Sequence, residues 1–249
     1  MKIARQVRQK SSSGIYHIML RGIDKQIIFN DDYDKEKFIE TLEKYKTISE
    51  YRIFAYCLMT NHIHLLIKVE KEDLDLIIKR IAGSYVYWYN WKYKRTGHLF
   101  QDRYKSEPVE NDEYFLTVIR YIHQNPIKSG FCKKPENYKY SSYNEYINEP
   151  IIIDRDFCLG IIGIEEFEEF HSQSNEDVCL DIKEKVFRMT DDEAMEIIRK
   201  VSHCKTVSDF QSLSIDKRNK YLKILREKGI SIRQLSRLTG ISYNIIRKY

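Results

Sequence analysis

The sequence predicts an α+β fold, in which a ferredoxin-like antiparallel sheet carries helices on one face and an all-α C-terminal region with a helix-turn-helix follows. Three observations support this prediction. Segments with strand and helix patterns follow one another in the order β-α-β-β-α-β-α, whose first six members match the split βαβ order. The balance of charge changes sign twice along the chain, and a short helical pattern lies near its end.

The first four elements follow from local patterning. Residues 14–21 alternate and are rich in residues that favour strands. Apolar side chains recur at helical spacing over residues 32–50, behind acidic residues of the kind that begin helices. Residues 52–59 and 62–69 then predict two strands, and the Thr60-Asn61 pair between them predicts a tight turn.

Three more elements complete this part of the chain. A long helix is expected from about residue 72 to residue 93, and residues 103–109 form the fourth predicted strand. The next helix is expected over residues 112–124, because Asn111 is a good N-cap and Pro126 disfavours helical geometry in the residue before it. In a ferredoxin-like unit the helices pack on one face of the sheet, so we expect the other face to be open.

Charge divides the chain into three predicted parts. Residues 1–150 carry 25 Lys and Arg against 20 Asp and Glu, and hydrophobic residues make up 42% of the whole chain, which is enough to form a core. Residues 151–196 carry 4 against 14, which indicates an acidic connector of helical character. Residues 197–249 are basic, with 13 Lys and Arg against 3 acidic residues from residue 199 on, a balance that attracts polyanions.

Cysteine usage and hydropathy indicate the compartment. The chain has an odd number of cysteines, and no two of them have the spacing of a metal or redox clip. A reduced, cytoplasmic protein is therefore expected. No run of apolar residues is long enough to span a membrane, and no apolar stretch follows the basic N-terminus, so neither a membrane partner nor a signal peptide is expected.

A His-Ile-His sequence lies in the strand predicted at 62–69. Side chains alternate between the faces of a strand, so His62 and His64 share the exposed face with Leu66 and Lys68, and their backbones lie roughly 6–7 Å apart. The opposite, buried face carries Ile63, Leu65, Ile67 and Val69. Two imidazoles at that spacing can bind one divalent cation, although at least one further ligand is needed. The alternative is a pair of half-exposed histidines without a partner. His17 and Arg21 share a face of the first strand, and a packed or surface position is favoured for His17.

Tyr121 lies beside the apolar stripe of the helix predicted over residues 112–124, and Asn125 follows four residues later. If the helix continues that far, both side chains point the same way and could supply a nucleophile and the missing metal ligand. A phenol has a pKa of about 10, and a nearby cation favours its ionised form. The competing interpretation is simple packing, because the chain has 19 tyrosines.

Basic residues in and after the long helix predict a track for the backbone of single-stranded DNA. Together with Arg21, the candidates are Lys92, Lys94, Arg95, Arg103 and Lys105. Each of them could instead be simply solvated. Six aromatic residues of the same helix, between Tyr85 and Tyr93, could stack on bases, but core or dimer packing is the favoured interpretation.

Residues 219–249 have the pattern of a helix-turn-helix, with a small residue at Ser236 and a glycine for the turn at Gly240. The second helix of such a motif enters the major groove of DNA. Here that helix would begin near Ser242. It would present four side chains, Tyr243, Asn244, Arg247 and Lys248. A helical packing domain that binds no DNA is the alternative.

Five sequence blocks carry a family resemblance. They are GIYHIMLRG at residues 14–22, CLMTNHIHLLI at 57–67, GHLFQDRYKSE at 97–107, YIHQNPIKSG at 121–130 and YKYSSYNEY at 138–146. In this order they resemble the HUH-type single-tyrosine transposases, which include insertion-sequence enzymes and repetitive-element-associated tyrosine transposases. The resemblance covers about residues 5–150. A single His-x-His sequence would be a weak signal, whereas five blocks in order are specific.

The resemblance implies a DNA transposase, or a related single-strand endonuclease, that acts on single-stranded or hairpin DNA. Its tyrosine would attack a phosphodiester, form a 5′-phosphotyrosine and free a 3′-OH, and the reverse step would join a new end. The nucleophile would be Tyr121. The ligands of a Mg²⁺ or Mn²⁺ ion would be His62, His64 and Asn125, the last of which stands where some members carry Gln.

We therefore expect residues 1–150 to be the catalytic domain and residues 197–249 to be a basic DNA-binding domain. Members of the family often work as dimers, and the sequence leaves open whether this chain forms a homodimer and whether its subunits share active sites. Two other functions compete. One is a domesticated, non-catalytic protein that holds hairpin DNA or RNA, and the other is a metal-dependent phosphoesterase that uses water as its nucleophile.

Overall fold

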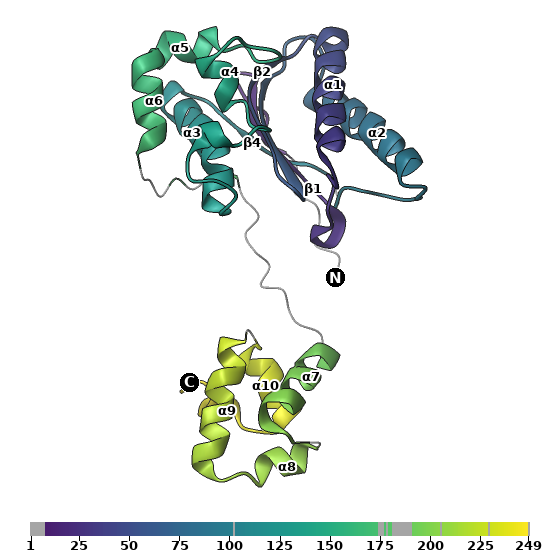
Figure 1. Ribbon diagram of the computed structural model, residues 1–249, viewed down its shortest axis with the longest axis vertical. Helices are drawn as coiled ribbons and strands as arrows, with labels where there is room; N and C mark the ends of the chain where they lie inside the picture. The colour runs from purple at the N-terminus through teal and green to yellow at the C-terminus, as the bar shows by residue number, and fades with distance from the viewer. Residues whose placement is uncertain are drawn as a thin grey trace. The chain divides into compact units, whose positions relative to one another are not determined.

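The computed structural model describes residues 8–101, 103–173, 177, 179–180, 191–204, 206–228 and 230–248. The chain divides into two compact units, residues 1–181 and residues 182–249 (Figure 1). These limits differ from the boundaries predicted at residues 150 and 196, because helices beyond residue 150 join the first core and a helix that begins before residue 196 joins the second. None of the described helices is long and apolar enough to cross a membrane.

The first unit is built on a four-stranded antiparallel sheet with the strand order β2-β3-β1-β4. The strands are β1 Ile15–Arg21, β2 Arg52–Leu58, β3 His62–Lys68 and β4 Lys105–Pro108. The helices among them are α1 Asp32–Ser49, α2 Leu74–Lys92 and the short 3-10 helix η1 Ile23–Lys25. The predicted mixture of helices with an antiparallel sheet is confirmed, and the elements follow the predicted order.

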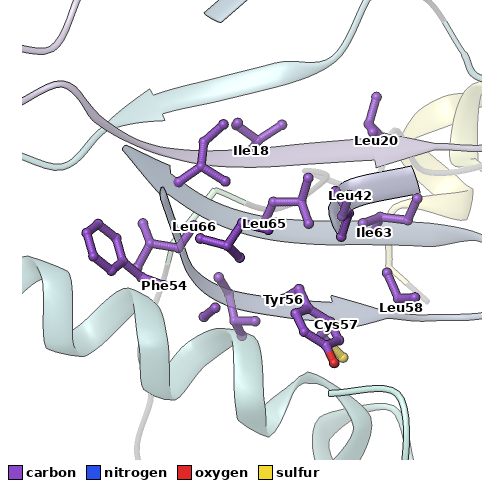
Figure 2. Close-up of a cluster of buried hydrophobic side chains, with 14 of the residues drawn as sticks. Ile18, Leu20, Leu42, Phe54, Tyr56, Cys57, Leu58, Ile63, Leu65 and Leu66 are labelled. Carbon is purple, nitrogen blue, oxygen red and sulfur yellow. The ribbon is translucent and has the colours of Figure 1, made fainter. Parts of the chain in front are cut away.

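Helices cover both faces of this sheet (Figure 1). Helices α1 and α2 pack together on one face, and α3, Asp112–Lys128, lies against β2 and β3 on the other. The expectation of an open second face is therefore wrong, because the apolar stripe of α3 needs a partner and the sheet supplies one. Leu65 and Leu66 of β3 point to opposite faces, and both are fully buried (Figure 2).

Helix α3 continues to Lys128, beyond its predicted end at Gln124, with Pro126 inside its last turn. Its start is as predicted, since the side chain of Asn111 accepts a hydrogen bond of 2.8 Å from a backbone N–H of the first turn. A proline removes its own N–H from the helix, and close to the C-terminus that loss affects a single hydrogen bond. Residues 121–126 are all buried, so packing keeps Asn125 helical although a proline follows it.

Short helices after α3 complete the first unit. They are η2 Pro135–Asn137, α4 Tyr143–Ile147, α5 Asp156–Ile162 and α6 Ile164–Ser172. Helices α5 and α6 belong to the segment predicted as an acidic connector, yet Cys158 and Phe167 are fully buried in the first core. The four glutamates of α6 are exposed, while Phe167 stacks on Tyr146 with ring centroids 4.5 Å apart. Residues 181–190 of that segment lie outside the described residues.

The YKYSSYNEY block secures the edge strand β2. The hydroxyls of Tyr138 and Tyr146 donate to main-chain carbonyls of β2 at 2.8 and 2.7 Å. Between them, the hydroxyl of Ser142 accepts from the backbone N–H of Tyr56 at 2.9 Å. Each contact satisfies a backbone group that an edge strand would otherwise present to solvent or to another chain. The block therefore acts as a scaffold for the sheet.

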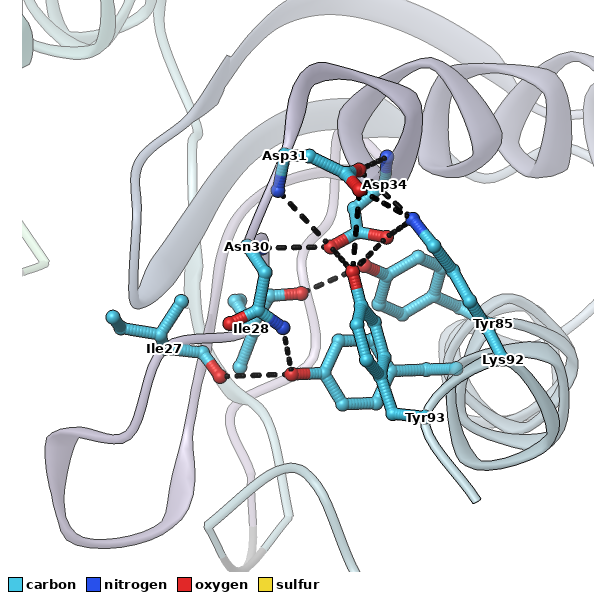
Figure 3. Close-up of polar contacts among 9 residues, drawn as sticks. Ile27, Ile28, Asn30, Asp31, Asp34, Tyr85, Lys92 and Tyr93 are labelled. Carbon is cyan, nitrogen blue, oxygen red and sulfur yellow. Dashed lines mark hydrogen bonds and ion pairs between the residues drawn. The ribbon is translucent and has the colours of Figure 1, made fainter. Parts of the chain in front are cut away.

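A polar network around Asp34 joins the start of α1 to the end of α2 (Figure 3). Asp34 is fully buried. Its carboxylate accepts hydrogen bonds from Lys92 Nζ at 2.6 Å, from the Tyr93 hydroxyl at 2.9 Å and from the backbone N–H of Asn30 at 2.6 Å. Asp31 caps α1 and pairs with the same lysine at 2.7 Å. A carboxylate is tolerated in the interior because its charge and lone pairs are matched in this way.

The second unit consists of helices around a small core of its own. The helices are α7 Asp191–Ser202, α8 Val207–Gln211, α9 Ile215–Glu227, α10 Ile232–Thr239 and α11 Tyr243–Ile246. Its core includes Phe210, Leu222, Leu225, Leu235 and Ile246. Gly240 ends α10 with a φ of +69°, a left-handed conformation that glycine adopts without strain. The all-α character predicted for this region agrees with the helices of this unit.

Candidate active site

Cross-strand register places the paired histidines beside Arg21. In the antiparallel pair of β1 and β3, Arg21 lies opposite His62, and Met19 lies opposite His64. Residues opposite one another share a face of the sheet, so both histidines share the α3-covered face with Arg21. His17 lies on that face too, four residues before Arg21. The prediction of an exposed histidine face is wrong for His64, which is fully buried under α3, whereas His62 is partly exposed.

Tyr121 reaches this face from α3. Its ring centroid lies 5.6 Å from that of His64 and 5.9 Å from that of His17, and both contacts are edge-on, at 79° and 67°. The ring centroids of His62 and His64 are 5.2 Å apart. Two imidazoles from a strand and a phenol from a distant helix therefore lie together within one chain.

Burial keeps the inner histidines neutral. Nε2 of His17 and Nδ1 of His64 are 3.0 Å apart and share a hydrogen bond. Loss of solvent lowers the pKa of His17 to about 3. Loss of solvent, with smaller contributions from His17 and His62, holds the pKa of His64 well below its usual value. Neutral imidazoles keep the lone pair that a metal ligand requires.

The donor set around these rings fits a divalent cation. Nε2 of His64 is buried and has no hydrogen-bond partner among the described residues, while Nδ1 of His62 lies 2.7 Å from Oδ1 of Asn61. Asn125 is 8% exposed and lies one helical turn after Tyr121. Over the described ranges, no group of three or more His, Cys, Asp or Glu is arranged to hold a metal. A site here would thus combine two imidazoles, a ligand type common to many divalent metals, with an amide oxygen, the ligand type of the three that suits Mg²⁺ or Mn²⁺.

Lys128 is a candidate residue that the sequence did not reveal. Its Nζ lies 5.0 Å from the centroid of the Tyr121 ring, two helical turns along α3. The spacing of seven residues could have indicated it, but the helix was expected to end at Gln124. An ammonium group at this place adds positive charge beside the phenol.

Two of the predicted basic residues lie close to the histidines. Arg21 is directly opposite His62, and its Nε is buried without a hydrogen-bond partner in the part of the chain that the structure describes. Lys105 lies opposite Met19 in the pair of β1 and β4, so it shares the histidine face, and it is exposed.

The other predicted basic residues are not equivalent. Lys92 makes ion pairs with Asp31 and Asp34 and is therefore part of the α1–α2 network. Lys94 and Arg103 are exposed, and Arg95 is partly buried. Tyr243, Asn244, Arg247 and Lys248 are exposed on the second unit.

Some aromatic residues of α2 are buried and others are exposed. Tyr85 and Tyr89 are buried in the core of the first unit, as the packing interpretation predicted. Tyr87 and Trp91 are 80% and 73% exposed. Helix α2 covers the sheet face opposite the histidines, so these rings lie away from the candidate site (Figure 1).

A buried histidine pair, also missed by the sequence analysis, clamps the tyrosine helix. Nδ1 of His123 on α3 lies 2.9 Å from Nε2 of His171 on α6, and Nε2 of His123 lies 2.8 Å from the hydroxyl of Ser142. Nδ1 of His171 donates to the carbonyl of Phe167 at 2.8 Å. Because Ser142 also holds β2, these contacts fix α3 between α6 and the sheet. Local patterning gave no sign of them, since α6 reads as a run of acidic residues.

This clamp predicts a loss of stability in mild acid. Burial lowers the pKa of His171 to about 4, despite the opposing effect of its bond to the Phe167 carbonyl. A neutral buried histidine stabilises the folded state fully above the ordinary pKa of about 6.5, and that stability is lost as the pH falls towards 4. At pH 5 we expect this residue to cost about 2 kcal/mol.

Urea unfolding at pH 7.5 and pH 5.0 tests that expectation. The free energy of unfolding of the His171→Gln variant should fall by about 2 kcal/mol less between the two pH values than that of the wild type. An equal fall in both proteins would show that His171 is not the residue responsible.

Known proteins resemble this chain. Residues 10–125 match the family model for IS200-like transposases. Over 159 residues the chain is 23% identical to a candidate REP-associated tyrosine transposase of Haemophilus influenzae, an alignment that covers 58% of this chain and 88% of the relative. A solved REP-associated tyrosine transposase bound to a REP hairpin matches with a TM-score of 0.56 and 12% identity, over 74% of this chain and 98% of the other. A candidate transposase from Deinococcus radiodurans matches with a TM-score of 0.35 and 17% identity, over 50% and 97%.

The likeness to the hairpin-bound structure concerns the fold, a mixed α/β unit on a four-stranded antiparallel sheet. The family match begins before β1 and ends at Asn125, so it includes His62, His64 and Tyr121. Residues 10–125 of this chain thus match the IS200-like transposases, the group that its sequence blocks resemble.

Proposed function

We propose that this protein is a DNA transposase, or a related single-strand nickase-ligase, that cleaves and rejoins single-stranded or hairpin DNA through a 5′-phosphotyrosine on Tyr121. The observation that carries the proposal is the contact between the Tyr121 ring and the buried, neutral His64 within one chain. A hairpin-bound relative with the same fold supports DNA as the partner.

The nucleophile is the phenol oxygen of Tyr121. It forms a bond to phosphorus, the bond from phosphorus to the 3′ oxygen breaks, and the 3′ oxygen leaves as a hydroxyl that takes up the proton lost by the phenol. The DNA 5′ phosphate stays on the tyrosine until a 3′-OH reverses the reaction. Because the energy of the broken bond is kept in the phosphotyrosine ester, no cofactor is consumed.

His62, His64 and Asn125 would hold the divalent ion, Mg²⁺ or Mn²⁺. The buried Nε2 of His64, without a hydrogen-bond partner among the described residues, supports this assignment. When bound, the cation would polarise the scissile phosphodiester and offset its negative charge. Arg21 would orient that phosphate from the opposite position on β1.

Basic residues around the site would hold the DNA backbone. Lys128 would add positive charge beside the phenol, and Lys105 would extend the contact along β4. Exposed Lys94 and Arg103, with the partly buried Arg95, would continue it. Lys92 is left out of this proposal because Asp31 and Asp34 already neutralise its charge.

We assign the chemistry to the first unit and propose that the second binds duplex DNA. The strand order and the βαββαβ sequence of elements support a ferredoxin-like class for the first unit. In the second unit, α10, the turn at Gly240 and α11 would form the helix-turn-helix. Its exposed Tyr243, Asn244, Arg247 and Lys248 would then face the major groove.

The test is covalent capture of DNA by the full-length chain. Wild-type protein is incubated with labelled hairpin oligonucleotides and Mn²⁺, resolved on a denaturing gel, and the modified peptide is identified by mass spectrometry. We expect a DNA adduct on the peptide that contains Tyr121. Cleavage without an adduct would instead identify a phosphoesterase that uses water, and binding without cleavage would identify a non-catalytic DNA-holding protein.

A further inference from the structure

The geometry points to residues that position the proposed metal ligands without binding the ion themselves. We infer that His17 is a positioning residue that fixes the tautomer and orientation of His64, and that Glu107 supports His17 in turn. This inference rests on the proposed function, because it concerns how His64 is prepared to bind a cation.

The contact between the two histidines is short and protected from water. Nε2 of His17 and Nδ1 of His64 are 3.0 Å apart, and both side chains are fully buried. They come from neighbouring strands in a diagonal position, because His64 lies opposite Met19 rather than opposite His17. Both rings also contact Tyr121 edge-on. His17 therefore touches the nucleophile and one ligand, although it is not itself placed as a ligand.

One proton decides which nitrogen of His64 can bind a metal. A neutral imidazole carries a single N–H, and a ligand nitrogen must have none. If Nε2 of His64 binds the cation, the proton sits on Nδ1 and is donated to Nε2 of His17. The proton of His17 must then sit on its own Nδ1. Hydrogen bonding by the second nitrogen is the usual way in which proteins orient a metal-binding histidine.

The pairing of β1 with β4 makes Glu107 the candidate acceptor for the proton on Nδ1 of His17. It lies directly opposite His17 in the pair of β1 and β4, on the same face of the sheet. Nδ1 of His17 and Oε2 of Glu107 are both buried, and neither has a hydrogen-bond partner in the described ranges. A side-chain rotation would join them into a line of carboxylate, imidazole and imidazole across β4, β1 and β3. That line ends at Nε2 of His64.

Simple packing does not account for this arrangement. A buried polar atom without a partner costs about 1–3 kcal/mol, and three such atoms lie here: Nδ1 of His17, Nε2 of His64 and Oε2 of Glu107. An apolar ring at position 17 would fill the same space without that cost. Unpaired groups concentrated beside a candidate ligand indicate a role that appears when a cation binds.

Metal affinity tests the inference independently of catalysis. Mn²⁺ binding to the full-length protein is measured by titration calorimetry for the wild type, His17→Phe, His17→Gln and Glu107→Leu. Phenylalanine keeps a ring but cannot accept the proton of His64, so we expect affinity to fall about 10- to 100-fold. Glutamine can accept it, so His17→Gln should recover most of the loss. Leucine at position 107 removes the acceptor of the His17 proton, so we expect Glu107→Leu to weaken binding, but less than His17→Phe does.

The outcomes separate this inference from the proposed function. If the wild type binds Mn²⁺ and His17→Phe binds it equally well, the role of His17 is overturned while the metal site stands. Unchanged affinity in Glu107→Leu would remove Glu107 alone. A wild type that binds no Mn²⁺ would overturn both the metal site and the inference.

A tautomer measurement covers the case in which His17→Phe does not fold. In the wild type, ¹⁵N NMR of the imidazole groups reports which nitrogen of His64 carries the proton. Addition of Mg²⁺ should place that proton on Nδ1, with Nε2 deprotonated. A proton that stays on Nε2 in the presence of Mg²⁺ would overturn the inference.

Discussion

Replacing Tyr121 with phenylalanine is expected to abolish the covalent DNA adduct and to lower strand cleavage by at least about 10⁴-fold, because a catalytic nucleophile has no substitute in its own site. The phenyl ring keeps the edge-on contacts with His64 and His17 and the position under Lys128. Folding and DNA binding should therefore be close to those of the wild type. Gel-resolved adduct formation and single-turnover cleavage measure the effect.

The matched control is Tyr143→Phe. Tyr143 is as buried as Tyr121, at 5% exposure, but it packs against His123 and Phe167 rather than against the paired histidines. We expect this variant to form the adduct at nearly the wild-type rate. An adduct that survives in Tyr121→Phe would remove Tyr121 from the mechanism and direct attention to another nucleophile.

The largest expected effect on stability comes from Asp34→Ala. The buried carboxylate of Asp34 accepts hydrogen bonds from Lys92, the Tyr93 hydroxyl and a backbone N–H (Figure 3). Removal of this carboxylate leaves the Tyr93 hydroxyl and the Asn30 N–H without their acceptor, whereas Lys92 keeps its ion pair with Asp31, so we expect a loss of about 3 kcal/mol. Both tryptophans of the chain lie on α2, so tryptophan fluorescence during urea unfolding reports the first unit directly.

Glu40→Ala provides the comparison on the same helix. Glu40 pairs with Lys37 at 2.7 Å, but 57% of its side chain is exposed, and surface pairs of this kind contribute little. We expect its unfolding midpoint to remain near that of the wild type. If Asp34→Ala and Glu40→Ala were equally stable in urea, the network around Asp34 would stabilise the first unit no more than an exposed ion pair does.

The local pattern of residues was sufficient to predict the helices and strands of the first unit, and to predict that the two histidines of β3 share a face. Alternation along HIHLLIK correctly placed His62 and His64 on one face, together with Leu66. Alternation cannot tell what covers that face, because burial depends on where a later helix packs. The single assumption that Pro126 ends α3 also concealed Lys128, which lies in the turn after the proline.

Contacts between residues that lie far apart in the chain could not be predicted from the sequence. The count of charges predicted that Lys92 binds DNA, because a count along the chain cannot show that Asp31 and Asp34 lie beside this lysine in space. The line from Glu107 to His17 to His64 depends on strand register, which becomes defined only when β4 and β3 pair with β1. The acidic helix α6 likewise gave no sign that its one buried histidine would bond to His123.

The position of α3 has a consequence for how the protein could work at low abundance. Each copy contains the complete set of rings, since Tyr121 meets His64 within the same polypeptide. Under the proposed function, each copy would therefore keep its nucleophile beside its candidate metal ligands on dilution, and the rate of cleavage per copy would not change with protein concentration. Encounter with a second copy would then matter for bringing two DNA ends together, and not for making the cut.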